Sequence, residues 1–112
     1  MFVELTMKRL IRDREFLKSC CTKHASLRRS RIRKASPQQI KTLCECARNV
    51  YKGNVPLPKS TVDKLRPYEK HLHELGFKKL KLDHKKRILQ RGGAIFLPLL
   101  AQIAAAIASS LL

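Results

Sequence analysis

An amphipathic helix is predicted for the stretch Ser36-Pro37-Gln38-Gln39-Ile40-Lys41-Thr42-Leu43-Cys44-Glu45-Cys46-Ala47-Arg48-Asn49-Val50-Tyr51. Ser36 can cap this helix, Pro37 suits its first position, and Gln39 can complete a capping box. Apolar side chains then recur at helical spacing: Ile40, Leu43, Cys44, Ala47, Val50 and Tyr51. Gly53 and Asn54 are expected to end the helix, and Pro56 and Pro58 prevent its continuation.

Weaker helical patterns lie on both sides of this stretch. Residues 2–24 have a loose amphipathic and basic pattern that predicts one helix. After the central helix, Ser60 can cap another helix, whose apolar stripe is Val62, Leu65, Tyr68, Leu72 and Leu75. Pro67 lies inside this pattern and predicts a kink or two abutting short helices, and Gly76 is expected to stop it.

A last basic helix is predicted from Asp83, as cap, to about Arg91, with Ile88 and Leu89 buried. The predicted fold class is therefore all-α: a small bundle of short amphipathic helices with a basic N-terminal helical arm and an apolar C-terminal helix. The expected organisation is an arm over residues 1–35, a small basic helical domain over 36–91, and a Gly-Gly joint with an uncharged apolar tail over 92–112.

The charge of the chain is confined to its first 91 residues. The 112 residues contain 25 Lys and Arg against 8 Asp and Glu, a formal net charge of +17. No ionisable side chain follows Arg91. A net charge of this size exceeds the magnitude of about 2–8 that is usual for a small soluble domain. Nucleic acid is the first partner to consider, and an anionic membrane surface is the second.

Two basic segments are the candidate phosphate-binding sites. No acidic residue occurs between Glu15 and Glu45, so the first segment has no opposite charge to offset it. The alternatives for it are a nuclear-localisation patch or a solvated helix face. The residues expected to bind double-stranded DNA, largely without sequence preference, are Arg28, Arg29, Arg31, Arg33, Lys34, Lys85, Lys86 and Arg87.

The uncharged tail permits three interpretations. Residues 94–112 would form a helix about 28 Å long, close to the roughly 30 Å hydrocarbon core of a bilayer. The tail is a membrane-active or anchoring helix, or it docks on a capsid protein, another partner or a second copy of the chain, or it is the last core helix of the domain. The residues expected to insert or dock are Ile95, Phe96, Leu97, Leu99, Leu100, Ile103 and Ile107.

No catalytic constellation is present in the sequence, so the protein is not expected to be an enzyme or to need a cofactor. The four histidines are scattered among lysines and are expected to be solvated. Cys20 and Cys21 with Cys44 and Cys46 have poor spacing for zinc, so no metal site is predicted, and the thiols are expected to be reduced. Gly92 and Gly93 form either an accessible segment that suits a protease cleft or a simple flexible joint.

The C-terminal sequence resembles a known family of viral proteins. The stretch Arg91-Gly92-Gly93-Ala94-Ile95-Phe96-Leu97-Pro98-Leu99-Leu100-Ala101-Gln102-Ile103-Ala104-Ala105-Ala106-Ile107 resembles the C-terminus of adenovirus core protein X, the precursor of the mu peptide. Cys46-Ala47-Arg48-Asn49-Val50, Gly53-Asn54-Val55-Pro56-Leu57, the region from Leu65 to Leu75, and Lys85-Lys86-Arg87-Ile88-Leu89-Gln90-Arg91-Gly92-Gly93 are similar to small basic proteins of Polinton/Maverick elements and adintoviruses.

This resemblance implies a protein of the virion and the host nucleus that binds and condenses double-stranded DNA. It also implies cleavage near the Gly-Gly pair by a viral cysteine protease. Such proteases favour Met, Leu or Ile four residues before the cut, and for a cut after Gly93 that position is Gln90, with Leu89 one residue out of register. The alternative to a virion protein is a membrane-associated basic protein that binds or disrupts anionic membranes.

Overall fold

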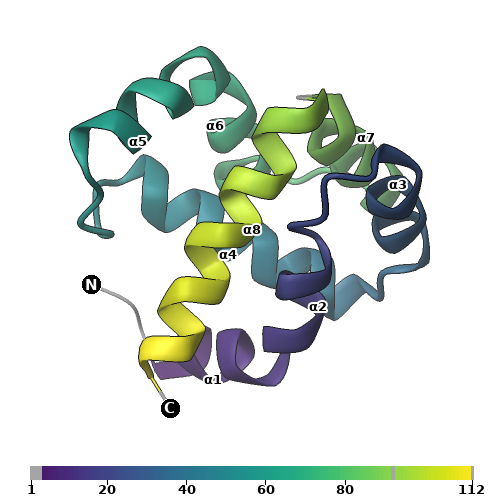
Figure 1. Cartoon of the computed structure of the whole chain (residues 1–112), viewed down its shortest axis with the longest axis horizontal. Helices are drawn as coiled ribbons and strands as arrows, with labels where there is room; N and C mark the ends of the chain where they lie inside the picture. The colour runs from purple at the N-terminus through teal and green to yellow at the C-terminus, as the bar shows by residue number, and fades with distance from the viewer. Residues whose placement is uncertain (1–3, 92, 112) are drawn as a thin grey trace.

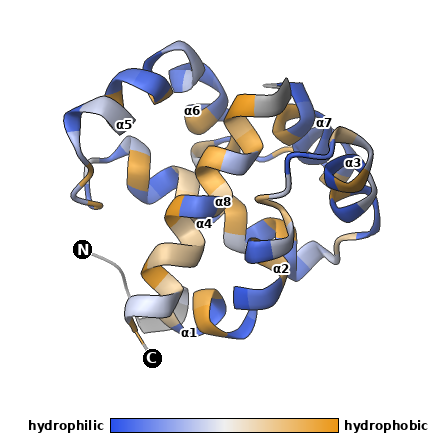
Figure 2. Cartoon of the chain, viewed as in Figure 1, coloured by the Kyte–Doolittle hydropathy of each residue, from blue (hydrophilic) through white to orange (hydrophobic). Residues whose placement is uncertain are grey.

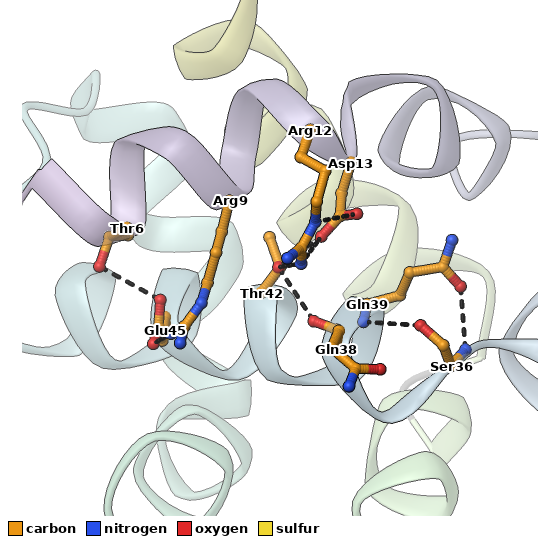
Figure 3. Close-up of polar contacts among 9 residues, drawn as sticks. All are labelled: Thr6, Arg9, Arg12, Asp13, Ser36, Gln38, Gln39, Thr42 and Glu45. Atoms are coloured by element: carbon orange, nitrogen blue, oxygen red, sulfur yellow. Dashed lines mark hydrogen bonds and ion pairs between the residues drawn. The ribbon is translucent and has the colours of Figure 1, made fainter.

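Helix α4 (Pro37–Tyr51) lies at the centre of the computed structural model, which describes residues 4–91 and 93–111. Its capping box is confirmed (Figure 3): the Ser36 hydroxyl accepts from the Gln39 amide at 3.1 Å, and the Gln39 side chain accepts from the Ser36 amide at 2.9 Å. At the other end, Gly53 adopts φ 74°. The amides of Gly53 and Asn54 donate to the carbonyls of Val50 and Asn49, the pairing of a Schellman motif.

The segment around Pro67 is divided as the proline predicts. Helix α5 (Lys59–Leu65) is followed by a 3-10 turn, η1 (Arg66–Tyr68), and then by α6 (Glu69–Phe77). The prediction that Ser60 caps the first of these helices is wrong, because α5 begins at Lys59 and no side chain caps it. Val62, which the stripe assigned to the apolar face, is 43% exposed.

Gly76 does not stop α6, contrary to the prediction. The helix continues through Phe77, and the glycine instead permits a close crossing with α4. A Cβ atom added at Gly76 would lie 2.7 Å from the Cα of Arg48, a separation that real Cβ atoms do not tolerate. The absence of a side chain at this position is therefore a requirement of helix packing.

The N-terminal region forms three helices, and the single helix predicted over residues 2–24 is wrong. These helices are α1 (Glu4–Arg12), α2 (Arg14–Ser19) and α3 (Ala25–Lys34). Asp13, at the junction of α1 and α2, is buried and accepts a 2.6 Å hydrogen bond from the Thr42 hydroxyl and a 2.8 Å bond from Arg12 (Figure 3). One turn further along α4, Glu45 pairs with Arg9 and accepts from Thr6 at 3.2 Å.

The last two helices are α7 (Leu82–Arg91) and α8 (Gly93–Ser110). Ile88 and Leu89 of α7 are fully buried, as predicted. In Figure 1, α8 crosses the middle of the molecule, and it packs against α1, α2, α4 and α7. Figure 2 shows that apolar residues cover most of its length. The uncharged tail is thus a core helix in this structure, the third of the three interpretations.

The fold is all-α, and the part of the chain that the structure describes contains no strand. Contacts run between all three segments that the sequence divides at residues 35 and 91, since α1 and α2 pack on α8, and α3 packs on α7. The described chain has a Cα radius of gyration of 12.6 Å and extents of 31 × 29 × 29 Å. The basic N-terminal segment is therefore packed into the body of the protein and does not project as an arm.

Candidate nucleic-acid interface

Helices α3 and α7 bring the two predicted phosphate-binding segments together. The helices pack against each other in space (Figure 1), although the sequence separates them by the whole of α4 to α6. Ile32 of α3 and Ile88 and Leu89 of α7 are fully buried. These apolar residues fix the two helices to the core and leave most of their basic residues at the surface.

Five of the eight predicted residues are exposed: Arg29, Arg31, Arg33, Lys34 and Arg87. Lys85 and Lys86 are half-buried. The Nζ atom of Lys86 donates a 2.8 Å hydrogen bond to the carbonyl of Arg33, in the last turn of α3. A cation at this end of a helix also interacts favourably with the helix dipole.

Arg28 does not belong to the exposed set, contrary to the prediction. Its side chain is buried, with 6% of the residue exposed, and Nη1 donates to the Thr22 carbonyl at 2.8 Å. Arg28 lies four residues before Ile32, so the two share the buried face of α3. That spacing is the sequence signal that separates a structural arginine from its surface neighbours.

The seven tail residues predicted to insert or dock differ in burial. Phe96, Leu97, Leu100 and Ile103 are buried, Leu99 and Ile107 are partly buried, and Ile95 is 54% exposed. No single helix of the described residues is both long and apolar enough to cross a bilayer. Helices α7 and α8 pass that test only as a pair, and they meet at a bend of 105°.

The predicted cleavage segment, Gly92 and Gly93, is only partly described by the structure. Gly92 lies outside the described residues. Gly93 is the first residue of α8, and its surroundings are not described. Cleavage at the Gly-Gly pair therefore stays a prediction.

Two histidines are part of aromatic clusters, so the expectation that all four are solvated is wrong. The ring of His71 lies 5.8 Å from that of Tyr68 and 5.3 Å from that of Phe96, between centroids. His71 Nδ1 is buried without a hydrogen-bond partner in the described structure. His73 stacks on Phe77 with the ring centroids 5.2 Å apart.

The cysteines are free thiols. Burial raises the pKa of Cys46 to about 12, and burial is also the main reason that the pKa of Cys20 rises to about 12. Both side chains are thus neutral core residues at ordinary pH. Within the described residues, no group of three or more His, Cys, Asp or Glu side chains is arranged to hold a metal ion.

The structure also contains a basic groove that the sequence prediction missed. It has a volume of about 560 Å³ and lies beside the crossing of α4 and α6. Its cationic lining residues are Lys41, Arg48, Lys52, Lys78, Lys79 and Lys85. The first three recur at seven- and four-residue intervals along α4, which would have identified one basic face of that helix.

These features define a compact all-α protein with a basic helix pair and a separate basic groove. Comparisons with models of known protein families, with curated proteins and with solved structures found no match.

Proposed function

We propose that this protein is a non-enzymatic DNA-binding protein that contacts phosphates without reading base sequence, and that it packs DNA in the core of a virus or virus-like element. The observation that carries the proposal is the packing of α3 against α7, which joins basic residues from distant parts of the chain. Among the described residues of these two helices, Asp83 is the single acidic one. About half to two-thirds of protein–DNA hydrogen bonds go to phosphate and sugar, often from Arg and Lys, and these contacts carry no sequence information directly.

The net charge of +17 gives DNA a physical role in the folding of the protein as well as in binding. Positive charges held on neighbouring helices repel one another and oppose the compact state. Phosphates that neutralise them release counterions and remove this repulsion. DNA binding is therefore expected to stabilise the fold.

Salt dependence of affinity is the test of this proposal. Contacts to about five phosphates give a slope of log K against log salt of about −4 to −5. Two unrelated duplex sequences should bind with equal affinity and equal slope. The triple variant Arg29→Gln, Arg31→Gln and Arg33→Gln should reduce the magnitude of the slope by about 3.

The matched control is Lys59→Gln, Lys64→Gln and Arg66→Gln, which removes the same charge from exposed positions of α5 and η1. It should leave most of the slope in place. An equal loss in both triple variants would reject the α3 and α7 interface. A strong preference for one duplex would reject binding without base readout.

The burial of α8 supports this proposal over a membrane-active protein. Insertion of α8 into lipid would remove Phe96, Leu97 and Leu100 from the core, where each is at most 2% exposed. Flotation with anionic vesicles separates the two functions. Binding through headgroups alone should be reversed by high salt, whereas salt-resistant binding would favour the membrane-active alternative.

A further inference from the structure

The basic groove combines cationic side chains with the exposed aromatic ring of Phe77. Lys41 and Arg48 of α4 and Lys52, the residue after α4, supply three of its cations. Lys78 and Lys79, which follow α6, and Lys85 of α7 supply the other three. Glu45 is the one carboxylate among the described lining residues, and its charge is offset by Arg9. The groove is therefore strongly cationic.

Phe77 stands at the end of α6 and lines this groove while remaining 38% exposed. The guanidinium carbon of Arg48 lies 4.7 Å from the centre of its ring. His73 stacks on it with ring planes 21° apart, and Tyr51 meets it edge-on at 5.4 Å between centroids. These neighbours hold the ring in place and cover part of it, so a ligand would stack on the part of the ring that stays exposed.

The aromatic cluster continues beyond the groove. Tyr51, which the sequence pattern assigned to the apolar face of α4, is instead 41% exposed. Tyr51 and His73 line a neighbouring hollow of about 340 Å³, and Lys78 borders both spaces. Glu69 and Glu74 also line this hollow, so the strongly cationic surface is the part around Phe77.

Cations beside exposed rings are the combination with which proteins bind single-stranded nucleic acid: the cations follow the backbone and the rings stack on unpaired bases. A duplex offers phosphates to such a site, but its bases are stacked on one another and cannot reach Phe77. We propose that the groove between α4 and the end of α6 binds single-stranded nucleic acid, with a base on Phe77 and phosphates on the surrounding lysines. This site is distinct from the duplex interface on α3 and α7, and Lys85 of α7 is the one residue that belongs to both sets.

The probe is a fluorescent oligothymidine of about 12 nucleotides, within the roughly 4–16 nucleotides that a single-strand-binding domain covers. The comparison strand has the same length and phosphate charge but lacks its bases. The unmodified protein should bind oligothymidine about 10-fold more tightly than the abasic strand, because only the former can stack. Equal binding of the two strands overturns the proposal without any mutation.

The variant Phe77→Leu keeps an apolar side chain and removes the ring. It should abolish the preference for oligothymidine over the abasic strand and leave duplex affinity within about twofold. Circular dichroism checks that the variant is folded; if it is not, Lys52→Gln with Lys79→Gln should lower oligothymidine affinity about 10-fold or more at low salt. A preference that survives in Phe77→Leu, or unchanged affinity in the lysine variant, contradicts the proposal.

The same measurements distinguish this site from the proposed duplex function. The triple variant of Arg29, Arg31 and Arg33 should weaken duplex binding and keep the preference for oligothymidine over the abasic strand. A protein that binds no duplex but keeps this preference would reject the duplex interface and retain the groove. A protein that binds duplex through α3 and shows no preference for oligothymidine over the abasic strand would retain the duplex interface and reject the groove.

Discussion

Lys86 and Arg33 are joined by a 2.8 Å hydrogen bond from the Nζ atom of Lys86 to the backbone carbonyl of Arg33, across 53 positions of sequence. The bond fastens the end of α3 to α7. It also holds two helices of the same charge side by side, which costs electrostatic energy unless an anion or salt intervenes.

Salt is therefore expected to stabilise the fold. Raising ionic strength from about 0.01 M to about 1 M shortens the Debye length from about 30 Å to about 3 Å and screens repulsion between α3 and α7. The melting temperature, followed by circular dichroism, should rise across this range and should rise further when duplex DNA is added at low salt. A melting temperature that falls with salt would mean that attractive ion pairs outweigh this repulsion.

Arg28 and Arg29 should have opposite roles although they are neighbours. Arg28→Met removes a buried hydrogen bond to the Thr22 carbonyl and should lower the free energy of unfolding by about 1–3 kcal/mol. Arg29→Met removes an exposed charge and should change it by less than about 0.5 kcal/mol. Urea unfolding measures both effects.

DNA affinity provides the converse measurement for the same pair. Arg29→Met should reduce the slope of log K against log salt by about 1, and Arg28→Met should leave that slope unchanged where the protein is folded. If Arg28→Met reduces the slope by as much as Arg29→Met does, the buried position of Arg28 is incorrect.

Phe96 and Ile95 offer a matched pair in the tail. Phe96 is fully buried and contacts the rings of Tyr68 and His71, whereas Ile95 is 54% exposed. Phe96→Ala should cost about 3–5 kcal/mol of stability, and Ile95→Ala should cost less than about 1 kcal/mol. Thermal or urea unfolding measures the stability loss of both variants. Equal, small effects would indicate that the tail is not part of the core.

Cys46 should make stability depend on alkaline pH. In the unfolded chain its pKa is near the ordinary value of about 8.5, whereas burial raises the pKa of Cys46 in the fold to about 12. Below about pH 8.5 both states hold the proton and the thiol has no effect. Above it the unfolded state loses the proton first, so stability falls by at most about 1.4 kcal/mol per pH unit until the folded thiol also ionises.

The measurement is urea unfolding under reducing conditions at about pH 8 and about pH 10.5. The unmodified protein should lose about 2 kcal/mol more than Cys46→Ala between these values. Cys21→Ala is the control, because Cys21 is only half-buried. Parallel losses in the unmodified protein and Cys46→Ala would show that the thiol does not contribute.

Local signals in the sequence predicted the elements that depend on nearby residues. The capping box of Ser36, the end of α4 before Gly53 and the division at Pro67 each follow from a few neighbouring positions, and the structure confirms all three. The basic residues of α3 and α7 were also found from the sequence. Their packing against each other was not, since nothing local specifies which helices meet.

The wrong predictions concern packing between distant segments. Gly76 was interpreted as a helix stop because its role depends on the position of Arg48 in α4. The tail was interpreted as a lipid-binding helix, a partner-binding helix or a core helix, and its lack of a polar face counted against the third interpretation. Its exposed side is instead a stripe that includes Gln102, Ala106 and Ser109, which are small or uncharged and give no strong polar signal.

The central claim is that α3 and α7 form one DNA interface. The most direct measurement is an amide chemical-shift titration of the isotopically labelled protein with a short duplex. The amides around Arg29, Arg31 and Arg33 and those around Arg87 should shift together, with one midpoint that moves to higher DNA concentration as salt is added. Shifts confined to one of the two helices, or concentrated on α5, would contradict the claim.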